Sequence, residues 1–408
     1  MKTKIINISK IYSWDTDLNC LDIKLNQEIL IQNNSIIKID DIISDEVDKI
    51  IDARGCIVTP GFIDSHTHPI FIGNRSNEFI MRLYGRSYDE IKESGGGILS
   101  SIKDVRQASF EELYLASLDN IKPFINYGTT TLEAKSGYGL TLEDEIKSLK
   151  VIDRISKELD IDIIPTFLGA HAIPEEYSIE RYVDIICNEM IPQVASDKLA
   201  VFCDVFCEEG YFNIGQSRKI LETAKNFGLI PRIHADEFKY FGASKLAAEL
   251  GAASADHLMV IDNEGMEALA QSDCIATILP GTTFFLNKDE YANGRRLIDA
   301  GCSLALASDF NPGTCTIRSL PNIMLLAMQH CGLTLDEAFL SVTYNAAKSL
   351  KRDKDIGLIK SGYNADILLW DINDLREIPY WYYSANTKID TIIKKGLINN
   401  KVNNIYYI

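Results

Sequence analysis

The chain has 408 residues, of which 46% are hydrophobic and 24% are charged. It can bury a sizeable core and is long enough for one large domain plus a small one. Its 41 Lys and Arg against 58 Asp and Glu give a net charge of −17 at pH 7, which opposes general binding to nucleic acid or to an anionic membrane. We therefore expect a small-molecule substrate and no nucleic-acid partner.

The amino-terminal segment MKTKIINISKIYSW has no long apolar core and no small-residue cleavage site, and no later segment is apolar for long enough to cross a bilayer. We expect a cytoplasmic protein without a membrane partner. The nine cysteines are scattered along the chain, which favours reduced and mostly buried thiols. Cys203 and Cys207 lack the usual two-residue zinc spacing, so we expect no metal role there.

The two ends of the chain have short segments of alternating polarity, such as KIINISKIYSW near the start and ADILLWDI near the end. This alternation is typical of half-buried strands. We expect residues 1–57 and 353–408 to form one small β-sandwich domain, with residues 58–352 inserted between them as a separate domain.

The middle of the chain repeats a short run rich in Ile, Val and Thr, a turn, and an amphipathic stretch of helical length such as LEDEIKSLKVIDRISKELD. Eight such units predict an α/β fold, a (β/α)₈ TIM barrel. The last helical stretch opens with Thr334-x-x-Glu337, a capping-box pattern. The eight candidate strands are residues 58–66, 128–136, 163–171, 200–208, 229–235, 253–258, 274–280 and 303–310.

Five of the six histidines fall at the carboxyl ends of predicted strands, where TIM barrels place their active sites. A lone histidine is more often a core or surface residue, but five at such ends favour one shared site. Asp309 ends the eighth strand, while His330 falls in a helix. The five are His66, His68, His171, His234 and His257.

His66 and His68 are separated by one residue in an extended segment, so both side chains point to one side and can bind one ion. His234 and Asp309 could complete the ligand set and leave a position for water, whose pKa the ion would lower to roughly 7. His257 is then available as a base for that water, and Asp309 could relay a proton to the leaving nitrogen. Glu237 could accept a hydrogen bond from a ring N–H or guide the water, and the alternative is an ordinary carboxylate at a helix start.

The motif PGFIDSHTH, with histidines on strands five and six and an aspartate on strand eight, resembles that of the amidohydrolase superfamily. The resemblance extends over nearly the whole chain, through segments such as TTTLEAKSGYGL, RIHADEF, SADHL and LASDFNPGT. It implies a homodimer with one Zn²⁺ or Fe³⁺ per subunit, bound by His66, His68, His234 and Asp309. It also implies substrate contacts from Arg75, Tyr138, His171, Glu237, Asn311, Gly313 and Thr314.

The side chains of these implied contact residues are chemically suited to bind a small anionic substrate. The guanidinium of Arg75 can hold a carboxylate through two parallel hydrogen bonds, unless it is an ordinary surface arginine. Glycines around Tyr138 let the chain bend so that the phenol faces a pocket, although loop packing is the alternative. The segment Asn311–Thr314 can offer donors to a carboxylate and is also an ordinary turn sequence.

A single ion is expected because binuclear members of the superfamily bridge two ions with a carboxylated lysine at the end of strand four. Here that strand ends in Phe206-Cys207-Glu208-Glu209. Lys135, on strand two, is expected to be an ion-pair partner instead.

The residues predict a metal-dependent hydrolase, and the resemblance implies that it opens a cyclic C–N bond, other than a peptide bond, in a small molecule with a carboxylate tail. One alternative is a deaminase of the same superfamily, whose neutral base would give Arg75 no carboxylate to bind. Another is a non-catalytic assembly protein, which the retention of every metal ligand disfavours.

Overall fold

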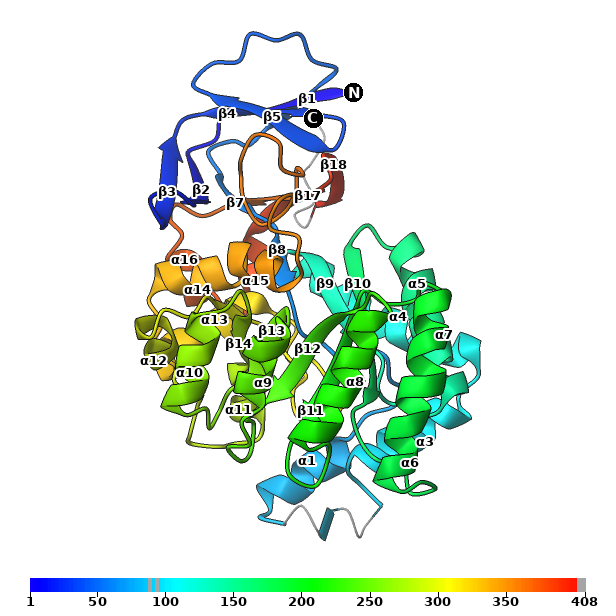
Figure 1. Ribbon diagram of the computed structural model, residues 1–408. Helices are drawn as coiled ribbons and strands as arrows, with labels where there is room; N and C mark the ends of the chain where they lie inside the picture. The colour runs from blue at the N-terminus through cyan, green and yellow to red at the C-terminus, as the bar shows by residue number, and fades with distance from the viewer. Residues whose placement is uncertain (87–89, 92–94, 402–408) are drawn as a thin grey trace.

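The computed structural model describes residues 1–86, 90–91 and 95–401, and it comprises a barrel and a smaller β domain (Figure 1). The small domain covers the end of the barrel opposite α1 (Ser76–Leu83). The last part of the expected carboxyl-terminal segment, residues 402–408, lies outside the described residues.

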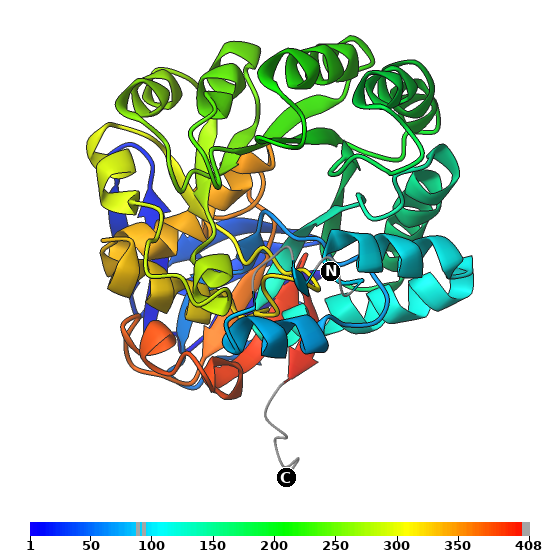
Figure 2. The ribbon, with the colours of Figure 1, turned by 90° about the horizontal axis from the view of Figure 1, so that it is seen from below.

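The predicted barrel is confirmed: within the described residues, an eight-stranded sheet runs in chain order, and each strand pairs in parallel with the next. Seen end on, the helices surround these strands (Figure 2). The strands are β8 (Phe62–Asp64), β9 (Thr129–Lys135), β10 (Asp162–Ala170), β11 (Phe202–Cys207), β12 (Ile230–Ala235), β13 (Ser254–His257), β14 (Ile275–Ile278) and β15 (Leu304–Leu306).

The ring closes just beyond the ends of β8 and β15. His68 N–H donates to the carbonyl of Phe310 at 2.8 Å, and Asp309 N–H donates to the carbonyl of His66 at 3.0 Å. Thr67 and Phe310 form a parallel bridge between the same two segments. The backbone that closes the barrel is therefore the backbone that carries three of the predicted metal ligands.

The helices bury their apolar faces against the strands, and one large hydrophobic cluster fills the barrel wall. The predicted capping box is confirmed, because Thr334 Oγ1 accepts from the Glu337 N–H and the Glu337 carboxylate accepts from the Thr334 N–H. After α1, the helices are α3 (Ile98–Gln107), α4 (Phe110–Asn126), α5 (Leu142–Glu158), α6 (Ile179–Ile185), the π-helix η1 (Ile186–Met190), α7 (Ile191–Ser196), α8 (Ile214–Asn226), α9 (Ala243–Leu250), α10 (Asn263–Ala270), α11 (Pro280–Phe285), α12 (Gly294–Asp299), α13 (Leu320–His330), α14 (Leu335–Ser341), α15 (Tyr344–Ser349), α16 (Glu377–Tyr380) and the 3₁₀ helix η2 (Ala385–Lys388).

The small domain contains strands from both ends of the chain, as expected. In the described part of the chain it has two sheets, ordered β5-β4-β1-β6 and β18-β17-β16-β7-β2-β3. Buried aliphatic side chains from both sheets form one cluster between them. The strands are β1 (Lys2–Ile6), β2 (Lys10–Asp15), β3 (Cys20–Leu25), β4 (Glu28–Gln32), β5 (Ser35–Asp40), β6 (Lys49–Asp52), β7 (Ile57–Pro60), β16 (Ile367–Trp370), β17 (Ile389–Lys394) and β18 (Leu397–Lys401).

The first predicted barrel strand, residues 58–66, divides into β7 and β8 at Gly61. β7 pairs antiparallel with β16, so this sheet of the small domain extends to Pro60. A Cβ atom on Gly61 would lie 2.2 Å from Thr130 Oγ1 on β9, so this close approach requires glycine. The chain passes directly from one domain to the other at this residue.

Two further expectations concern the cysteines and membrane spans. All nine cysteines are free thiols, and eight of them are buried. None of the helices in residues 1–86, 90–91 and 95–401 combines the length and the apolar character that a bilayer crossing needs.

An ion cluster joins the small domain to the start of β10. Asp162 lies 2.7 Å from Lys395 Nζ and 3.1 Å from Lys394 Nζ, and Arg352 Nη2 lies 3.5 Å from the same carboxylate. Burial raises the pKa of Asp162, but Lys394 and Lys395 outweigh burial, so the net pKa is lowered from 3.8. The charged form of Asp162 therefore stabilises the fold.

We predict that Asp162→Asn lowers the free energy of unfolding at pH 7 by about 2 kcal/mol, because the cations lose their shared counter-charge. The folded-state pKa is depressed, so this contribution is complete above the unfolded value of 3.8 and disappears as the pH falls through the lower folded value. Urea unfolding should give the same difference from wild type at pH 7 and pH 5, and a smaller one below about pH 4. Asp160→Asn, at an exposed neighbour, is the control, and equal losses in both variants would contradict the prediction.

Candidate metal and catalytic site

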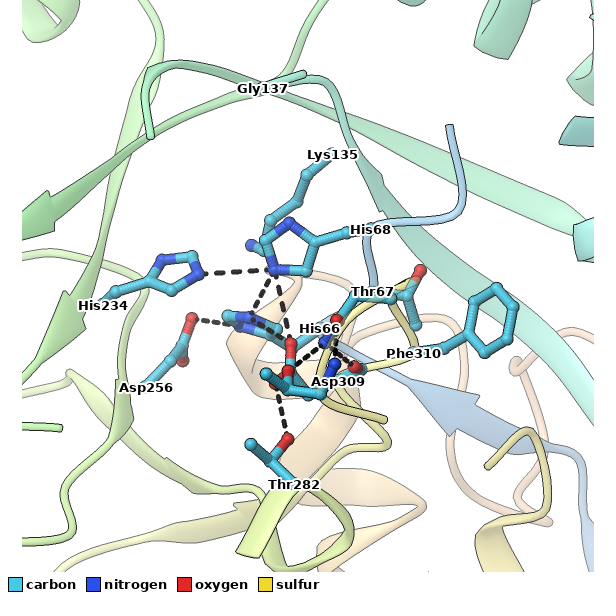
Figure 3. Close-up of polar contacts among 12 residues, drawn as sticks. His66, Thr67, His68, Lys135, Gly137, His234, Asp256, Thr282, Asp309 and Phe310 are labelled. Atoms are coloured by element: carbon cyan, nitrogen blue, oxygen red, sulfur yellow. Dashed lines mark hydrogen bonds and ion pairs between the residues drawn. The ribbon is translucent and has the colours of Figure 1, made fainter. Parts of the chain in front are cut away.

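The structure brings all four predicted metal ligands together around His68 (Figure 3). His68 Nε2 lies 3.2 Å from His66 Nε2 and 3.4 Å from His234 Nε2. Asp309 Oδ1 lies 3.4 Å from His68 Nε2 and 3.5 Å from His66 Nε2. All four side chains are buried and come from the carboxyl ends of β8, β12 and β15.

These distances fit a shared ion. Ligand atoms about 2.0–2.1 Å from a tetrahedral zinc lie about 3.3–3.4 Å from one another. Imidazole nitrogens that face each other with their lone pairs repel unless a cation lies between them. Among the described residues, His66, His68 and Asp309 form one group of candidate ligand atoms within 4.8 Å of one another, and His234 joins a second group through His66.

A buried carboxylate fixes the orientation of the His66 ring. Asp256 Oδ2 lies 2.8 Å from His66 Nδ1, and Arg232 Nη2 donates to the same oxygen at 3.3 Å. The His66 Nδ1 therefore carries the proton, and its Nε2 lone pair is directed to the ion.

A second buried carboxylate supports His234. Asp204 Oδ2 lies 3.1 Å from His234 Nδ1, although the angle falls short of a hydrogen bond. Lys135 Nζ lies 2.8 Å from both Asp204 and Glu133, and all three side chains are fully buried. The prediction that Lys135 is an ion-pair partner is confirmed.

The pKa values of the three ligand histidines are shifted in different directions. Burial holds the pKa of His66 and of His68 well below the usual value, so both are neutral. Burial also lowers the pKa of His234, but Asp204 outweighs burial and raises the pKa overall. A bound ion needs an unprotonated His234 nitrogen, so metal binding competes with protonation of this histidine.

Asp309 is held by its neighbours. Its backbone has a φ of 52°, in the left-handed region, and Thr282 Oγ1 donates to its Oδ2 at 2.6 Å. With Oδ2 satisfied in this way, Oδ1 is the oxygen that faces the histidines.

His257 and Glu237 lie beside the proposed ligands, and the pKa values of both side chains are strongly shifted. His257 Nδ1 is 3.6 Å from Glu237 Oε1, and His257 has a strained φ of 80°. Burial lowers the pKa of His257 to about 3. Burial and the charge of Asp309 raise the pKa of Glu237 to about 8. At neutral pH the histidine is therefore unprotonated and the carboxyl group is protonated, and the pKa of Glu237, close to neutrality, suits this carboxyl group to proton transfer.

A cavity of about 530 Å³ opens over the ligands, a volume suited to a small molecule. Its wall includes most of the predicted substrate residues, whereas Gly313 is not among the lining residues. Those that line it are Arg75, Tyr138, His171, Glu237, Asn311 and Thr314.

His171 and Tyr138 form one side of the cavity. His171 stacks on His68 with a centroid distance of 5.1 Å, and its Nδ1 lies 2.9 Å from the carbonyl of Gly137. Its Nε2 is therefore the acceptor. Burial raises the pKa of Tyr138, which stays a neutral donor. Glu145 accepts from the N–H groups of the two residues after Tyr138 and so holds this loop.

The loop after β15 uses its donors internally. Asn311 Oδ1 accepts from the N–H of Gly313 at 2.8 Å and from the N–H of Thr314 at 2.7 Å. Asn311 Nδ2 donates to Thr314 Oγ1 at 2.7 Å. The backbone donors that the sequence assigns to a carboxylate are thus engaged by Asn311, which shapes the loop.

Sequence reasoning missed the partner of Arg75. Nε and Nη2 of Arg75 donate to the carboxylate oxygens of Glu78 at 2.8 and 2.6 Å. The spacing of three residues on a helix was the available signal. Arg82 and Lys288, also not singled out, line the same cavity.

The fold and the site together define a metal-dependent hydrolase of the amidohydrolase class, which acts on C–N bonds. A model of the amidohydrolase family matches residues 216–398. An imidazolonepropionase of Brevibacillus brevis is 47% identical over 86% of this chain and 82% of its own length. That of Kosmotoga olearia is 45% identical over 97% of both chains. The chain belongs to the imidazolonepropionase family.

Solved structures with lower identity share the fold alone. An adenosine deaminase of Xanthomonas campestris with bound zinc has a TM-score of 0.75 at 12% identity, covering 97% of this chain and 92% of its own. A 5-methylcytosine deaminase of Klebsiella pneumoniae has a TM-score of 0.75 at 16% identity, covering 99% of this chain and 98% of its own.

We predict that Asp256→Asn weakens zinc binding by about 10- to 100-fold, because a neutral amide no longer raises the basicity of the His66 ring. The dissociation constant should be measured by competition with a chromogenic chelator, with circular dichroism of the metal-free proteins as the folding check. Glu145→Gln is the matched control, since it removes a buried carboxylate that touches none of the ligand rings. Wild-type affinity in Asp256→Asn would refute the role of this carboxylate.

Proposed function

We propose that the protein hydrolyses the ring of 4-imidazolone-5-propanoate to give N-formimidoyl-L-glutamate, a step of histidine degradation. Water adds across the cyclic amide, the C–N bond breaks, and the ring carbonyl becomes a carboxylate. The observation that carries the proposal is Arg75 in the wall of the cavity that opens on the metal ligands. The family membership supports the same substrate.

We propose one Zn²⁺ or Fe³⁺ per subunit, held by His66, His68, His234 and Asp309. When bound, such an ion acts as a Lewis acid and makes water nucleophilic at neutral pH. The single-ion stoichiometry is supported by Lys135, whose ammonium group is already paired with Glu133 and Asp204.

The protonation states assign roles to the neighbouring side chains. Neutral His257 accepts the proton that the attacking water loses. Protonated Glu237 donates to the ring nitrogen as the C–N bond breaks, and Asp309 is the second candidate for this transfer. The first proton of the water goes to His257, and the ring nitrogen receives one from Glu237. The second proton of the water is released to solvent when the new acid ionises to the carboxylate, and the proton on His257 then passes to Glu237, so the exchange balances.

The cavity wall orients the substrate. Arg75 binds the propionate carboxylate through its remaining N–H groups. The Tyr138 phenol donates to the ring, and His171 Nε2 accepts from a ring N–H. Asn311 and Thr314, from the loop after β15, complete the wall, and Gly313 lies between them in the same loop.

The other expectations for this protein rest on the family resemblance and the sequence composition. The cytoplasmic location and the homodimer stay predictions. The net charge of −17 argues against nucleic acid as a binding partner.

The direct test is a ring-opening assay with 4-imidazolone-5-propanoate, run beside guanine and cytosine on a preparation of known metal content. We expect turnover of the imidazolone only, about one zinc or iron per chain, and loss of activity on chelation that the metal restores. Deamination of guanine or cytosine would support the deaminase alternative, and two ions per site would refute the single-ion proposal.

We predict that His257→Ala lowers kcat by about 10²- to 10⁴-fold, the usual contribution of a general base. Metal content should not change, because His257 is outside the four-ligand set. His330→Ala, at the exposed end of α13, is the control and should keep wild-type kcat. Near-normal turnover of His257→Ala would remove this histidine from the mechanism.

A further inference from the structure

Three charged residues lie along one side of α1, at its N-cap and within its first two turns. Arg75 is the N-cap residue, and Glu78 and Arg82 follow at spacings of three and four. These spacings place side chains next to one another on a helix. Both arginines line the cavity.

Glu78 holds Arg75 in place and takes up part of its hydrogen-bonding capacity. The Glu78 carboxylate accepts from Nε and Nη2 of Arg75, and Oε1 also accepts from the Gly97 N–H at 3.0 Å. The pair is largely buried, with side-chain exposures of 11% and 8%. Arg75 is therefore pre-oriented, but its charge is already balanced by Glu78.

Arg82 differs from Arg75 in that its charge is not balanced by an ion pair among the described residues. Its Nη2 donates to the carbonyl of Gly313 at 2.8 Å, and its buried Nε has no hydrogen-bond partner. Within residues 1–86, 90–91 and 95–401, no ion pair involves Arg82. Burial, and then the charge of Arg75, lowers the pKa of Arg82, yet an arginine stays protonated. A half-buried guanidinium group that forms no ion pair among the described residues favours an anionic ligand beside it.

Both guanidinium groups meet at Gly313. A Cβ atom on Gly313 would lie 2.1 Å from Arg75 Nη1, and the carbonyl of the same residue accepts from Arg82. The two arginines thus lie against one small stretch of the wall. Together with Glu78 they carry one net positive charge, which matches one carboxylate.

Lys288, another cation of the wall, has a different environment. Its Nζ lies 4.8 Å from the Phe238 ring centroid, and its charge lowers the pKa of Glu237. It therefore lies near the acid–base pair, so the tail of the substrate meets the α1 arginines instead.

We propose that Arg82 is a specificity-determining residue, a second guanidinium that binds the tail carboxylate of the substrate together with Arg75. Glu78 is the positioning residue that holds Arg75. The inference deepens the proposed function and rests on it. It means that the enzyme selects for an anionic tail by a charge that only the bound substrate neutralises.

The test compares two unreactive probes, imidazole-4-propanoate and its neutral propanamide, on zinc-loaded protein by calorimetry. We expect Arg82→Met to weaken binding of the carboxylate by about 10- to 100-fold, the range for a hydrogen bond to a charged group. Binding of the amide should change little. Arg82→Lys should recover part of the affinity, and Arg86→Met, which removes an exposed charge paired with Glu90, should match wild type.

Steady-state kinetics separate this inference from the proposed function. If wild type opens the imidazolone ring and Arg82→Met leaves KM unchanged, or if both probes weaken equally, the role of Arg82 is wrong. If wild type fails to open the ring while the carboxylate selectivity still depends on Arg82, the proposed function alone is wrong. Zinc content and melting temperature identify a variant that fails to fold, and Arg82→Lys then decides the outcome.

Discussion

The closure of the barrel between β8 and β15 is the interaction on which the site depends. Two backbone hydrogen bonds, from His68 to Phe310 and from Asp309 to His66, join the segments that follow these strands. The same segments carry three of the four proposed metal ligands. Forming the ring and assembling the ligands are therefore one event, and no flexible loop intervenes between the scaffold and the chemistry.

Buried charge then sets the behaviour of the site. Asp256 and Asp204 lie behind His66 and His234 and are themselves balanced by Arg232 and Lys135. These pairs orient the rings at a cost in desolvation that a purely structural core would avoid. The same low-dielectric surroundings lower the pKa of His257 and raise the pKa of Glu237, so that the carboxyl group is protonated at neutral pH. One property of the interior thus orients the ligands and tunes the acid–base pair.

The sequence predicted the parts of this arrangement that follow from periodicity. The carboxyl ends of the strands in a parallel barrel converge, so the sequence alone predicted that the five strand-end histidines share one site. The side-chain partners could not. The pairing of Arg75 with Glu78 depends on rotamers, the capture of the Gly313 and Thr314 N–H groups by Asn311 depends on the loop conformation, and the break at Gly61 depends on the distance to β9. Residue spacing alone specifies none of these contacts, although the spacing of three residues between Arg75 and Glu78 permits their pair.

The break at Gly61 has a consequence for how the two domains work together. Because β7 belongs to the sandwich and β8 to the barrel, the strand that leads to His66 and His68 is tethered to the sheet formed by both chain ends. A change in that sheet would therefore shift β8, the first strand of the barrel, and with it His66 and His68. The small domain lies at the end of the barrel opposite α1, yet it anchors the segment that leads to two of the proposed ligands.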